Sequence, residues 1–178
     1  AHTLPTQGAL DAIREADAII LGPGSLYTSI IPNLLVDGMV EAIVQSQALK
    51  IYICNVMTQF RETDQFAASD HARALVTHTS PGIFQVCIVN TKPVPPDLLE
   101  KYRTEHAFPV EPDVERIRAL GAQVVAAEVI STQNYVRHDA DRLARLIIHL
   151  TVGTRRASGA SGSAPGSSPP SPQAVVTG

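Results

Sequence analysis

A short apolar run that ends in a glycine turn is the feature that most constrains the fold of this chain. Residues 18–21 are all apolar, and Gly22-Pro23-Gly24 follows them at once. An apolar run of this length, bounded by Gly and Pro, is typical of a strand buried on both faces of a parallel sheet. Small hydroxyl side chains come next, at Ser25, Thr28 and Ser29. Because glycines allow close backbone approach and the free N–H groups at a helix start attract anions, this stretch predicts a loop for a phosphate-bearing molecule, a nucleotide above all.

Further apolar runs alternate with helical patterns along the chain. The strands expected beside 18–21 are 51–54, 84–89 and 124–129. The helices expected around them are 4–16, 39–44, 64–78, 95–103, 112–120 and 139–150. This alternation predicts an α/β, Rossmann-like three-layer fold with a mainly parallel sheet. Ligands bind outside the carboxyl ends of such strands, so the loops that follow them should share one edge: the Gly22 loop, 55–64, 90–91 and 131–139.

The string from residue 22 to residue 35, GPGSLYTSIIPNLL, resembles the signature loop of the gluconeogenesis factor family (YvcK-like). It more distantly resembles a loop of the 2-phospho-L-lactate transferases (CofD-like), with which that family shares a fold. Three further strings agree in order: YICNVMTQ at 52–59, ETDQFAASDH at 62–71 and RHD at 137–139. The resemblance runs from about residue 4 to residue 150. Phe60-Arg61 stands where the family usually carries Pro-Gly.

The resemblance implies that the chain corresponds to the C-terminal portion of a family member. The family opens with a strand and a glycine-rich loop of the GGGTG type, and neither precedes residue 18. Residues 1–153 are therefore expected to form a CofD/YvcK-like α/β nucleotide-binding domain that lacks the N-terminal strand or strands and the glycine loop. From residue 157 to 178, 18 of 22 residues are Ala, Gly, Ser or Pro and none is charged. Residues 154–178 are expected to form a disordered tail.

Composition and charge argue against several classes of partner. The formal net charge is -3, and Arg155-Arg156 is the only basic run, so no nucleic-acid partner is expected. No apolar stretch reaches the roughly 18–20 residues that span a bilayer, and the chain does not start with a leader pattern. No membrane partner and a cytoplasmic location are therefore expected. Cys54 and Cys87 each lie in an apolar run, which predicts buried free thiols rather than a disulfide or a metal site.

The candidate ligand contacts are the loop residues that follow the expected strands. They are Gly22, Pro23, Gly24, Ser25, Leu26, Thr28, Ser29, Asn55, Thr58, Gln59, Asp64 and His138. Glycine amides and hydroxyl groups can donate hydrogen bonds to phosphate. The Asn55 side chain can form hydrogen bonds with a base, a ribose or a sugar hydroxyl. A structural role is the alternative for several of them: Ser25 as a helix cap, Asn55 in an Asx turn, and Asp64 as the N-cap of helix 64–78. No catalytic residue and no metal ligand is assigned.

The resemblance implies a regulator that binds a UDP-sugar or another nucleotide and acts on carbon metabolism, cell shape and cell-wall precursor supply. Such a regulator requires no cofactor, with Mg²⁺ as an optional companion of the nucleotide. A regulatory protein partner and self-association into a homo-oligomer are both compatible with this function. The alternative is an enzyme of the 2-phospho-L-lactate transferase type, which uses a GDP-linked donor and Mg²⁺. The element Gly-Ser-Leu-Tyr at 24–27, in place of Ser-Asn-Pro, and the lack of a clear acid/base pair favour the regulator.

Overall fold

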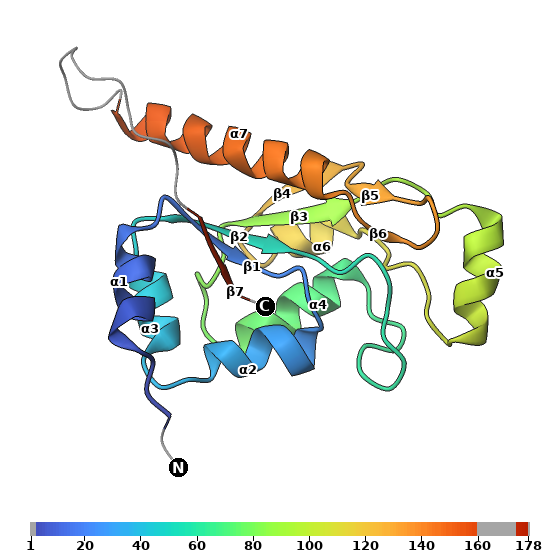
Figure 1. The fold of residues 1–178 in the computed structure, drawn as a ribbon, viewed down its shortest axis with the longest axis horizontal. Coiled ribbons are helices and arrows are strands. Elements are labelled where there is room, and N and C mark those ends of the chain that lie inside the picture. Colours follow the sequence, from blue (N-terminus) through green and yellow to red (C-terminus); the bar gives the residue numbers. More distant parts are fainter. Residues whose placement is uncertain (1–2, 160–173, 178) are drawn as a thin grey trace.

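Strands and helices alternate along the chain in the expected order (Figure 1). The computed structural model describes residues 3–159 and 174–177. The strands are β1 (Ala18–Leu21), β2 (Leu49–Ile53), β3 (Val86–Asn90), β4 (Gln123–Ala127), β5 (Ile130–Ser131), β6 (Arg137–His138) and β7 (Ala174–Thr177). The helices are α1 (Gln7–Glu15), the π-helical turn η1 (Leu26–Ile30), α2 (Ile31–Leu34), α3 (Met39–Gln45), α4 (Ala68–His78), α5 (Pro96–Thr104), α6 (Val114–Arg118) and α7 (Ala140–Gly159).

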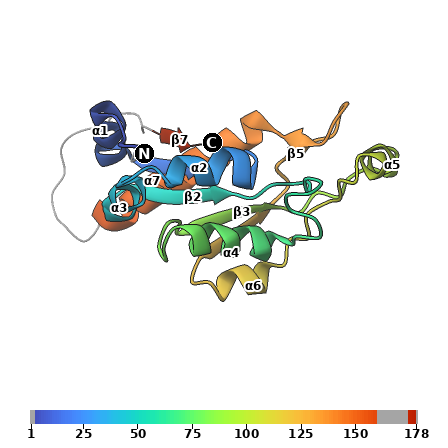
Figure 2. The ribbon, with the colours of Figure 1, turned by 90° about the horizontal axis from the view of Figure 1, so that it is seen from below.

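The main sheet is parallel throughout, in the order β4-β3-β2-β1-β7. Strands β5 and β6 form a separate antiparallel pair after β4. Because the four strands β1 to β4 run in one direction, their carboxyl ends meet at one edge, as predicted from the alternation of elements. The two views in Figures 1 and 2 show α5 standing apart from the sheet, beyond this edge.

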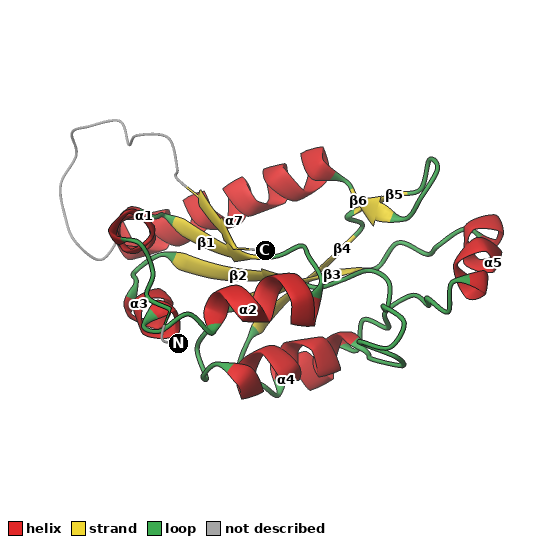
Figure 3. Cartoon of the chain, turned by 60° about the horizontal axis from the view of Figure 1, so that its bottom comes forward, coloured by secondary structure: helices red, strands yellow, loops and turns green. Residues whose placement is uncertain are grey.

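Side chains alternate between the two faces of the sheet and build a separate core on each. Ile19 and Leu21 of β1 pack with residues of the helices α1 to α4 and α6, whereas Ala18 and Ile20 pack against α7. Figure 3 shows α7 on one side of the sheet and α2, α3 and α4 on the other. Alternation of side chains with a period of two residues on a doubly covered sheet produces this arrangement. The three-layer α/β fold predicted from the sequence is thus confirmed.

Helix α4 begins later than the sequence predicted. The expected start was Asp64, acting as N-cap, but the helix begins at Ala68. Gln65 has a φ of 61°, a left-handed conformation that a right-handed helix cannot contain. The Asp64 carboxylate instead accepts the backbone N–H of Arg61, and Asp70 accepts the N–H of Ala67 at the true start. The prediction that Asp64 caps this helix is therefore wrong.

The C-terminal segment also differs from the prediction. Helix α7 continues to Gly159, well past the expected end at residue 150, and its first turn is capped by Asp139 as expected. Residues 174–177 form strand β7, which pairs in parallel with β1. The prediction of disorder therefore fails for residues 154–159 and 174–177, and residues 160–173 lie outside the described part. Three of the four residues of β7, Val175, Val176 and Thr177, are β-branched, but the composition of the whole segment, rich in Ala, Gly, Ser and Pro, masked this signal.

Two further predictions concern the thiols and the membrane. Cys54 and Cys87 are both free and buried, as expected. Within residues 3–159 and 174–177, no single helix is long and apolar enough to cross a membrane. One bent helix pair, 26–34 with 39–45, meets that test by length and composition only, and its residues Leu26, Ile30 and Ile43 are buried in the core.

Candidate functional site

The segments that follow strands β1 to β4 meet around a hollow of about 300 Å³, which we call the strand-end hollow. It contains residues from the loop after β1, the loop after β2, helix α5 after β3, and the β5–β6 pair after β4. Its lining consists of Pro23, Gly24, Ser25, Asn55, Val56, Met57, Gln59, Tyr102, Val136, Arg137 and His138. A hollow at the carboxyl edge of a parallel sheet is where this class of fold binds ligands.

The glycine turn after β1 is needed for the backbone to leave the sheet. Gly22 has a φ of +84°, and a Cβ atom built there would lie 3.1 Å from the carbonyl oxygen of Ile53. A side chain is therefore excluded both by the backbone conformation and by the neighbouring strand. Gly22 is buried beneath the loop, whereas Pro23 and Gly24 line the hollow. The turn thus brings the next backbone segment to the rim of the hollow.

A chain of side-chain hydrogen bonds holds this loop to the loop after β2. The Ser25 hydroxyl donates to the Glu62 carboxylate at 2.7 Å, and the Thr28 hydroxyl donates to Ser25 Oγ at 2.6 Å. Ser25 is the residue before η1, yet its side chain makes no capping bond. The alternative role of Ser25 as a side-chain helix cap is therefore not what the structure shows. Its hydroxyl instead links the two loops that flank the hollow.

Two amide oxygens beside the hollow are buried and have no hydrogen-bond partner among the described residues. They are Asn55 Oδ1, directly after β2, and Gln59 Oε1, further along the same loop. A buried acceptor without a partner is unfavourable by about 1–3 kcal/mol, and such groups are rare in native proteins. Both residues also line the hollow, which makes them candidates for binding a ligand with hydroxyl or N–H groups.

His138 brings a third acceptor to the same place. Its Nε2 donates to the carbonyl of Cys54 at 3.3 Å, which leaves Nδ1 without a proton in the neutral ring. Burial lowers the pKa of His138, and the bond to Cys54 opposes that effect only in part. The ring is therefore neutral at pH 7, so it offers the hollow an acceptor rather than a positive charge.

Cationic and aromatic side chains gather at the hairpin side of the hollow. Arg137 lines it, and its guanidinium carbon lies 5.2 Å from the centre of the Tyr135 ring. The ammonium of Lys101 lies 3.7 Å from the same ring centre. The Tyr102 hydroxyl accepts the backbone N–H of Val136, which joins α5 to the β5–β6 hairpin. Of the two cations, Arg137 is the one that lines the hollow, where it can meet an anionic ligand group.

Half of the predicted contact residues line the strand-end hollow: Pro23, Gly24, Ser25, Asn55, Gln59 and His138. The other half do not line it and have structural contacts instead. Leu26 is fully buried in the core, and the Thr58 hydroxyl accepts the backbone N–H of Phe108. The Ser29 carbonyl accepts an N–H of Asn33. Gly22, Thr28 and Asp64 have the conformational and hydrogen-bonding roles described above.

Several residues in or beside the hollow were not among the predicted contacts. Val56, Met57 and Arg137 are neighbours of predicted contacts, so loop position alone pointed toward them. Glu62 stands in the string ETDQFAASDH, and its link to Ser25 could not be read from a spacing of 37 residues. Tyr102 carries no sequence signal, because its place beside Val136 depends on how α5 packs.

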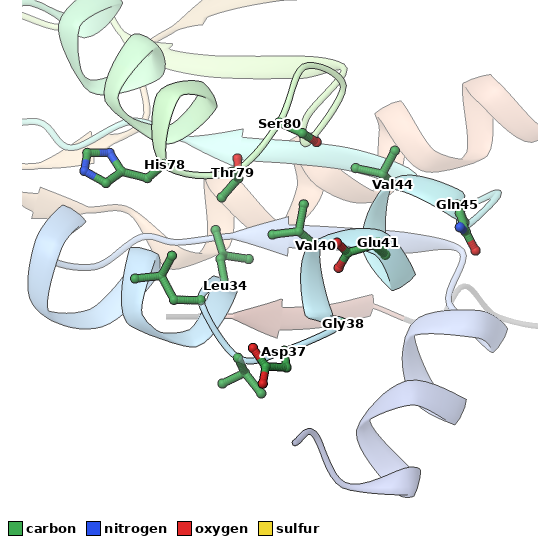
Figure 4. A pocket seen from close by; sticks show the side chains of 12 residues that line it. Leu34, Asp37, Gly38, Val40, Glu41, Val44, Gln45, His78, Thr79 and Ser80 are labelled. Atoms are coloured by element: carbon green, nitrogen blue, oxygen red, sulfur yellow. The ribbon is translucent and has the colours of Figure 1, made fainter. Parts of the chain in front are cut away.

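A larger hollow lies beside the C-terminal end of α4, as Figure 4 shows. Its volume is about 460 Å³, and its lining includes Leu34, Val40, Val44 and the end of α4 at His78. The carboxylate of Glu41 also lines it and would repel a phosphate group. Size alone favours this hollow, but its aliphatic and acidic lining does not suit a nucleotide. The strand-end hollow is the better candidate because it combines a glycine loop, unpaired acceptors and a cation.

The described residues hold no group of three or more His, Cys, Asp or Glu side chains placed to bind a metal ion. The Glu62 carboxylate is hydrogen-bonded to the glycine loop, because one of its oxygens accepts the Ser25 hydroxyl. Cys54 is not available as a ligand, because burial raises the pKa of its thiol to about 12. The polar groups at the hollow thus favour an organic ligand that carries hydrogen-bond donors and negative charge.

Comparison with known proteins identifies the family of this chain. Residues 1–130 match the family model described as 2-phospho-L-lactate transferase CofD. The chain is 44% identical over 147 residues to the gluconeogenesis factor of Bacillus subtilis, which covers 82% of this chain and 46% of that protein. It is 46% identical over 147 residues to the gluconeogenesis factor of Halalkalibacterium halodurans, with the same coverage of each chain.

Solved structures agree with the family match. A crystal structure of a Bacillus halodurans protein superimposes with a TM-score of 0.79 at 45% sequence identity, covering 81% of this chain and 47% of that one. The chain thus spans about half the length of the relatives it matches, and it corresponds to their C-terminal part. From the match over residues 1–130, together with the shared fold, the chain belongs to the CofD family, and within it the chain is similar to the gluconeogenesis factors.

Proposed function

We propose that this chain supplies one wall of a nucleotide-sugar site in a gluconeogenesis factor, a cytoplasmic regulatory protein. The ligand would be a UDP-sugar. Its binding would allow the protein to regulate carbon metabolism, cell shape and cell-wall precursor supply according to the level of that sugar. The observation that carries the proposal is the pair of buried, unpartnered amide oxygens of Asn55 and Gln59 at the strand-end hollow. No cofactor is needed for such a sensor, and Mg²⁺ would act only as a companion of the diphosphate.

The chemistry of the hollow supports a ligand with two kinds of group. Sugar or ribose hydroxyls, and the N–H of a pyrimidine base, donate the hydrogen bonds that Asn55, Gln59 and His138 can accept. The diphosphate would meet the backbone at Gly24 and the guanidinium of Arg137, which line the same hollow. A volume of about 300 Å³ lies at the lower end for small-molecule sites, which fits one wall of a larger cleft.

Regulation is favoured over catalysis because the lining lacks an acid/base pair. His138 is neutral at pH 7 and already bonded to a carbonyl through Nε2, and Tyr102 accepts a backbone N–H. A sensor needs only differential binding between two conformations, which a regulatory protein partner or a second copy could detect. The names of the similar relatives, gluconeogenesis factors, support the same class.

The description of the matching family model supports one alternative, a transferase acting on a GDP-linked donor with Mg²⁺. The Glu62 carboxylate, bonded to Ser25 beside the glycine loop, would then help to hold the metal with the nucleotide phosphates. This function predicts a preference for GDP over UDP-sugar and a requirement for Mg²⁺. The nucleotide preference and the dependence on Mg²⁺ can both be measured on this chain.

Calorimetric titration of the 178-residue chain tests the proposal, with UDP-N-acetylglucosamine as the probe and GDP plus Mg²⁺ as the comparator. Saturable binding of the UDP-sugar without Mg²⁺ is the expected result. Preference for GDP with Mg²⁺ would support the transferase instead. Binding of neither by the folded chain would reject this chain as a nucleotide-sugar binder by itself.

Two substitutions separate a ligand role from a structural role. Asn55→Leu and Gln59→Met remove the unpartnered oxygens at similar side-chain volume, so the free energy of unfolding should stay the same or rise. The affinity for the UDP-sugar should fall about tenfold or more, equivalent to about 1.4 kcal/mol. Gln47→Met is the matched control, because Gln47 is exposed and precedes β2 at the opposite edge of the sheet. Equal affinity in all three variants would remove the basis of the assignment.

A further inference from the structure

We propose that the larger hollow beside α3 is a docking site for helix α7 of a second copy of this chain, so that copies associate head to tail. The part of α7 that would enter the hollow is its outward stripe, Arg145, Ile148 and His149. The inference does not depend on nucleotide-sugar binding, because neither surface shares a residue with the lining of the strand-end hollow.

The larger hollow combines an aliphatic lining with negative charge. Leu34, Leu35, Val40 and Val44 supply the aliphatic surface, and the carboxylates of Asp37 and Glu41 also line it, as Figure 4 shows for most of them. Leu35 is 60% exposed and Val44 is 36% exposed, although both are aliphatic. The lining contains no Lys or Arg, and Glu41 forms no ion pair within residues 3–159 and 174–177. An exposed aliphatic surface with unbalanced negative charge favours a partner that is apolar and basic.

The outward stripe of α7 has this composition. The inner face of α7 packs against the sheet through Leu143, Leu146, Ile147 and Leu150. On the opposite face Ile148 is 52% exposed, and Arg145 and His149 beside it are also exposed. Residues three and four apart lie on the same face of a helix, so these three side chains form one continuous stripe. A helix that presents an aliphatic and a basic side chain in this way is suited to an apolar, acidic hollow.

Arg145 is the cation on α7 that is available for a partner. Its single hydrogen bond within the described part of the chain runs from Nε to the Asp141 carbonyl at 3.3 Å, so its terminal nitrogens can meet a carboxylate. The other arginines of α7 with described side chains already have acidic partners. Arg142 pairs with Glu128 and Asp139, and Arg155 pairs with Asp17. We therefore expect Arg145 of one copy to meet Glu41 of the next, with Ile148 against Val40 and Val44.

The arrangement of the two surfaces determines the kind of assembly. Helix α7 lies on one side of the sheet, whereas α2, α3 and α4, which line the larger hollow, lie on the other (Figure 3). Each copy therefore offers a stripe to one neighbour and a hollow to another. A contact between two different surfaces is heterologous, and it continues beyond the dimer unless the copies close into a ring.

Sedimentation velocity tests the inference on the 178-residue chain, at concentrations from about 1 μM to 1 mM, the range of weak association. The parent chain should form dimers and larger species as the concentration rises. Glu41→Arg and Arg145→Glu should each weaken self-association about tenfold or more, because each places like charges in the contact. Glu100→Arg and Arg103→Glu on α5 are the matched controls and should associate like the parent, since both positions are exposed and away from the two surfaces.

Mixing the two variants distinguishes the proposed contact from other causes. The Glu41→Arg chain keeps its stripe and the Arg145→Glu chain keeps its hollow, so their mixture should form a 1:1 dimer and stop there. The double variant Glu41→Arg/Arg145→Glu should regain self-association, which a misfolded variant would not do. A parent chain that stays monomeric throughout, a mixture that stays monomeric while the parent associates, or single variants that associate like the parent would each overturn the inference.

Discussion

Ser25 and Glu62, 37 residues apart in the sequence, are joined by a hydrogen bond of 2.7 Å between the serine hydroxyl and the carboxylate. The bond connects the loop after β1 to the loop after β2, and Thr28 extends it through Ser25 Oγ. Both loops contribute to the lining of the strand-end hollow. The geometry of the hollow therefore depends on this pair as much as on the residues that line it.

Glu62→Ala should loosen the glycine loop. A charge-assisted bond between partly buried groups contributes about 1–2 kcal/mol, so the free energy of unfolding should fall by about that amount. Urea unfolding at pH 7.5 measures it. Glu100→Ala is the control, since Glu100 makes only an exposed pair with Arg103 on α5 and should change stability by less than about 0.5 kcal/mol. Equal effects of the two substitutions would show that the Ser25–Glu62 bond adds nothing.

Gly22→Ala should destabilise the fold, whereas Gly8→Ala should not. The first substitution forces a Cβ onto a residue with φ +84° and places it 3.1 Å from a carbonyl oxygen, which costs about 1–2 kcal/mol or more. Gly8 lies in α1, and a Cβ atom added there would meet no atom within 4 Å, so alanine should stabilise that helix by roughly 0.5–1 kcal/mol. Thermal unfolding of the two variants should show midpoint shifts of opposite sign. A rise for Gly22→Ala would contradict the close approach of Gly22 to β2.

Stability should fall as the pH drops below about 6.5, through His71. The ring is fully buried: Nδ1 donates to the Ala67 carbonyl, and Nε2 has no partner among the described residues. Burial lowers the pKa of His71 from the ordinary histidine value of 6.5. The unfolded chain therefore takes up the proton at a higher pH than the folded chain, and folding loses free energy as the pH falls from about 6.5 toward the lowered value.

The pH effect can be assigned by comparing unfolding in urea at pH 7.5 and pH 5.5. His71→Asn keeps a donor for Ala67 but removes the titrating ring, so the loss of stability between the two pH values should shrink. His138, whose pKa is lowered by burial in the same way, accounts for part of the loss that remains. His149→Asn, at an exposed position on α7, should behave like the parent chain. The same loss in His71→Asn as in the parent would exclude His71 as the source.

The two thiols should not react while the chain is folded. Burial raises the pKa of Cys54 to about 12 and also raises the pKa of Cys87, so almost no thiolate is present at pH 8. Iodoacetamide should label neither residue in native buffer and both in about 6 M guanidinium, a concentration well above the unfolding range of ordinary domains. Native labelling of either residue, detected by mass spectrometry, would contradict this burial.

Periodicity and strand-end position predicted the layers and the edge where the loops meet. The fully apolar run at β1 identified a strand buried on both faces, and Gly22 marked its end. The start of α4 was mispredicted because Asp64 resembles an N-cap in sequence, whereas the left-handed backbone at Gln65 delays the helix. A conformation of this kind depends on the loop's tertiary contacts, which local sequence does not specify.

The details of the site depended on contacts between distant segments. Asn55 and Gln59 were expected near a ligand from their position after β2, but only the fold reveals that their amide oxygens are buried without partners among the described residues. Glu62 and Tyr102 owe their places to hydrogen bonds with Ser25 and Val136, which lie 37 and 34 residues away. Strand β7 could not be predicted from a segment rich in Ala, Gly, Ser and Pro, because its pairing depends on the open edge of β1.

Hydrogen exchange of the 178-residue chain, with and without UDP-N-acetylglucosamine, tests most directly where the ligand binds. Binding in the strand-end hollow predicts slower exchange at residues 22–29, 55–59 and 136–138, the segments that surround it. Hydrogen exchange should be the same with and without the ligand at residues 34–45 and 78–80, which surround the larger hollow between α3 and the end of α4. Protection confined to that larger hollow, or no protection at the glycine loop at saturating ligand, would contradict the proposed site.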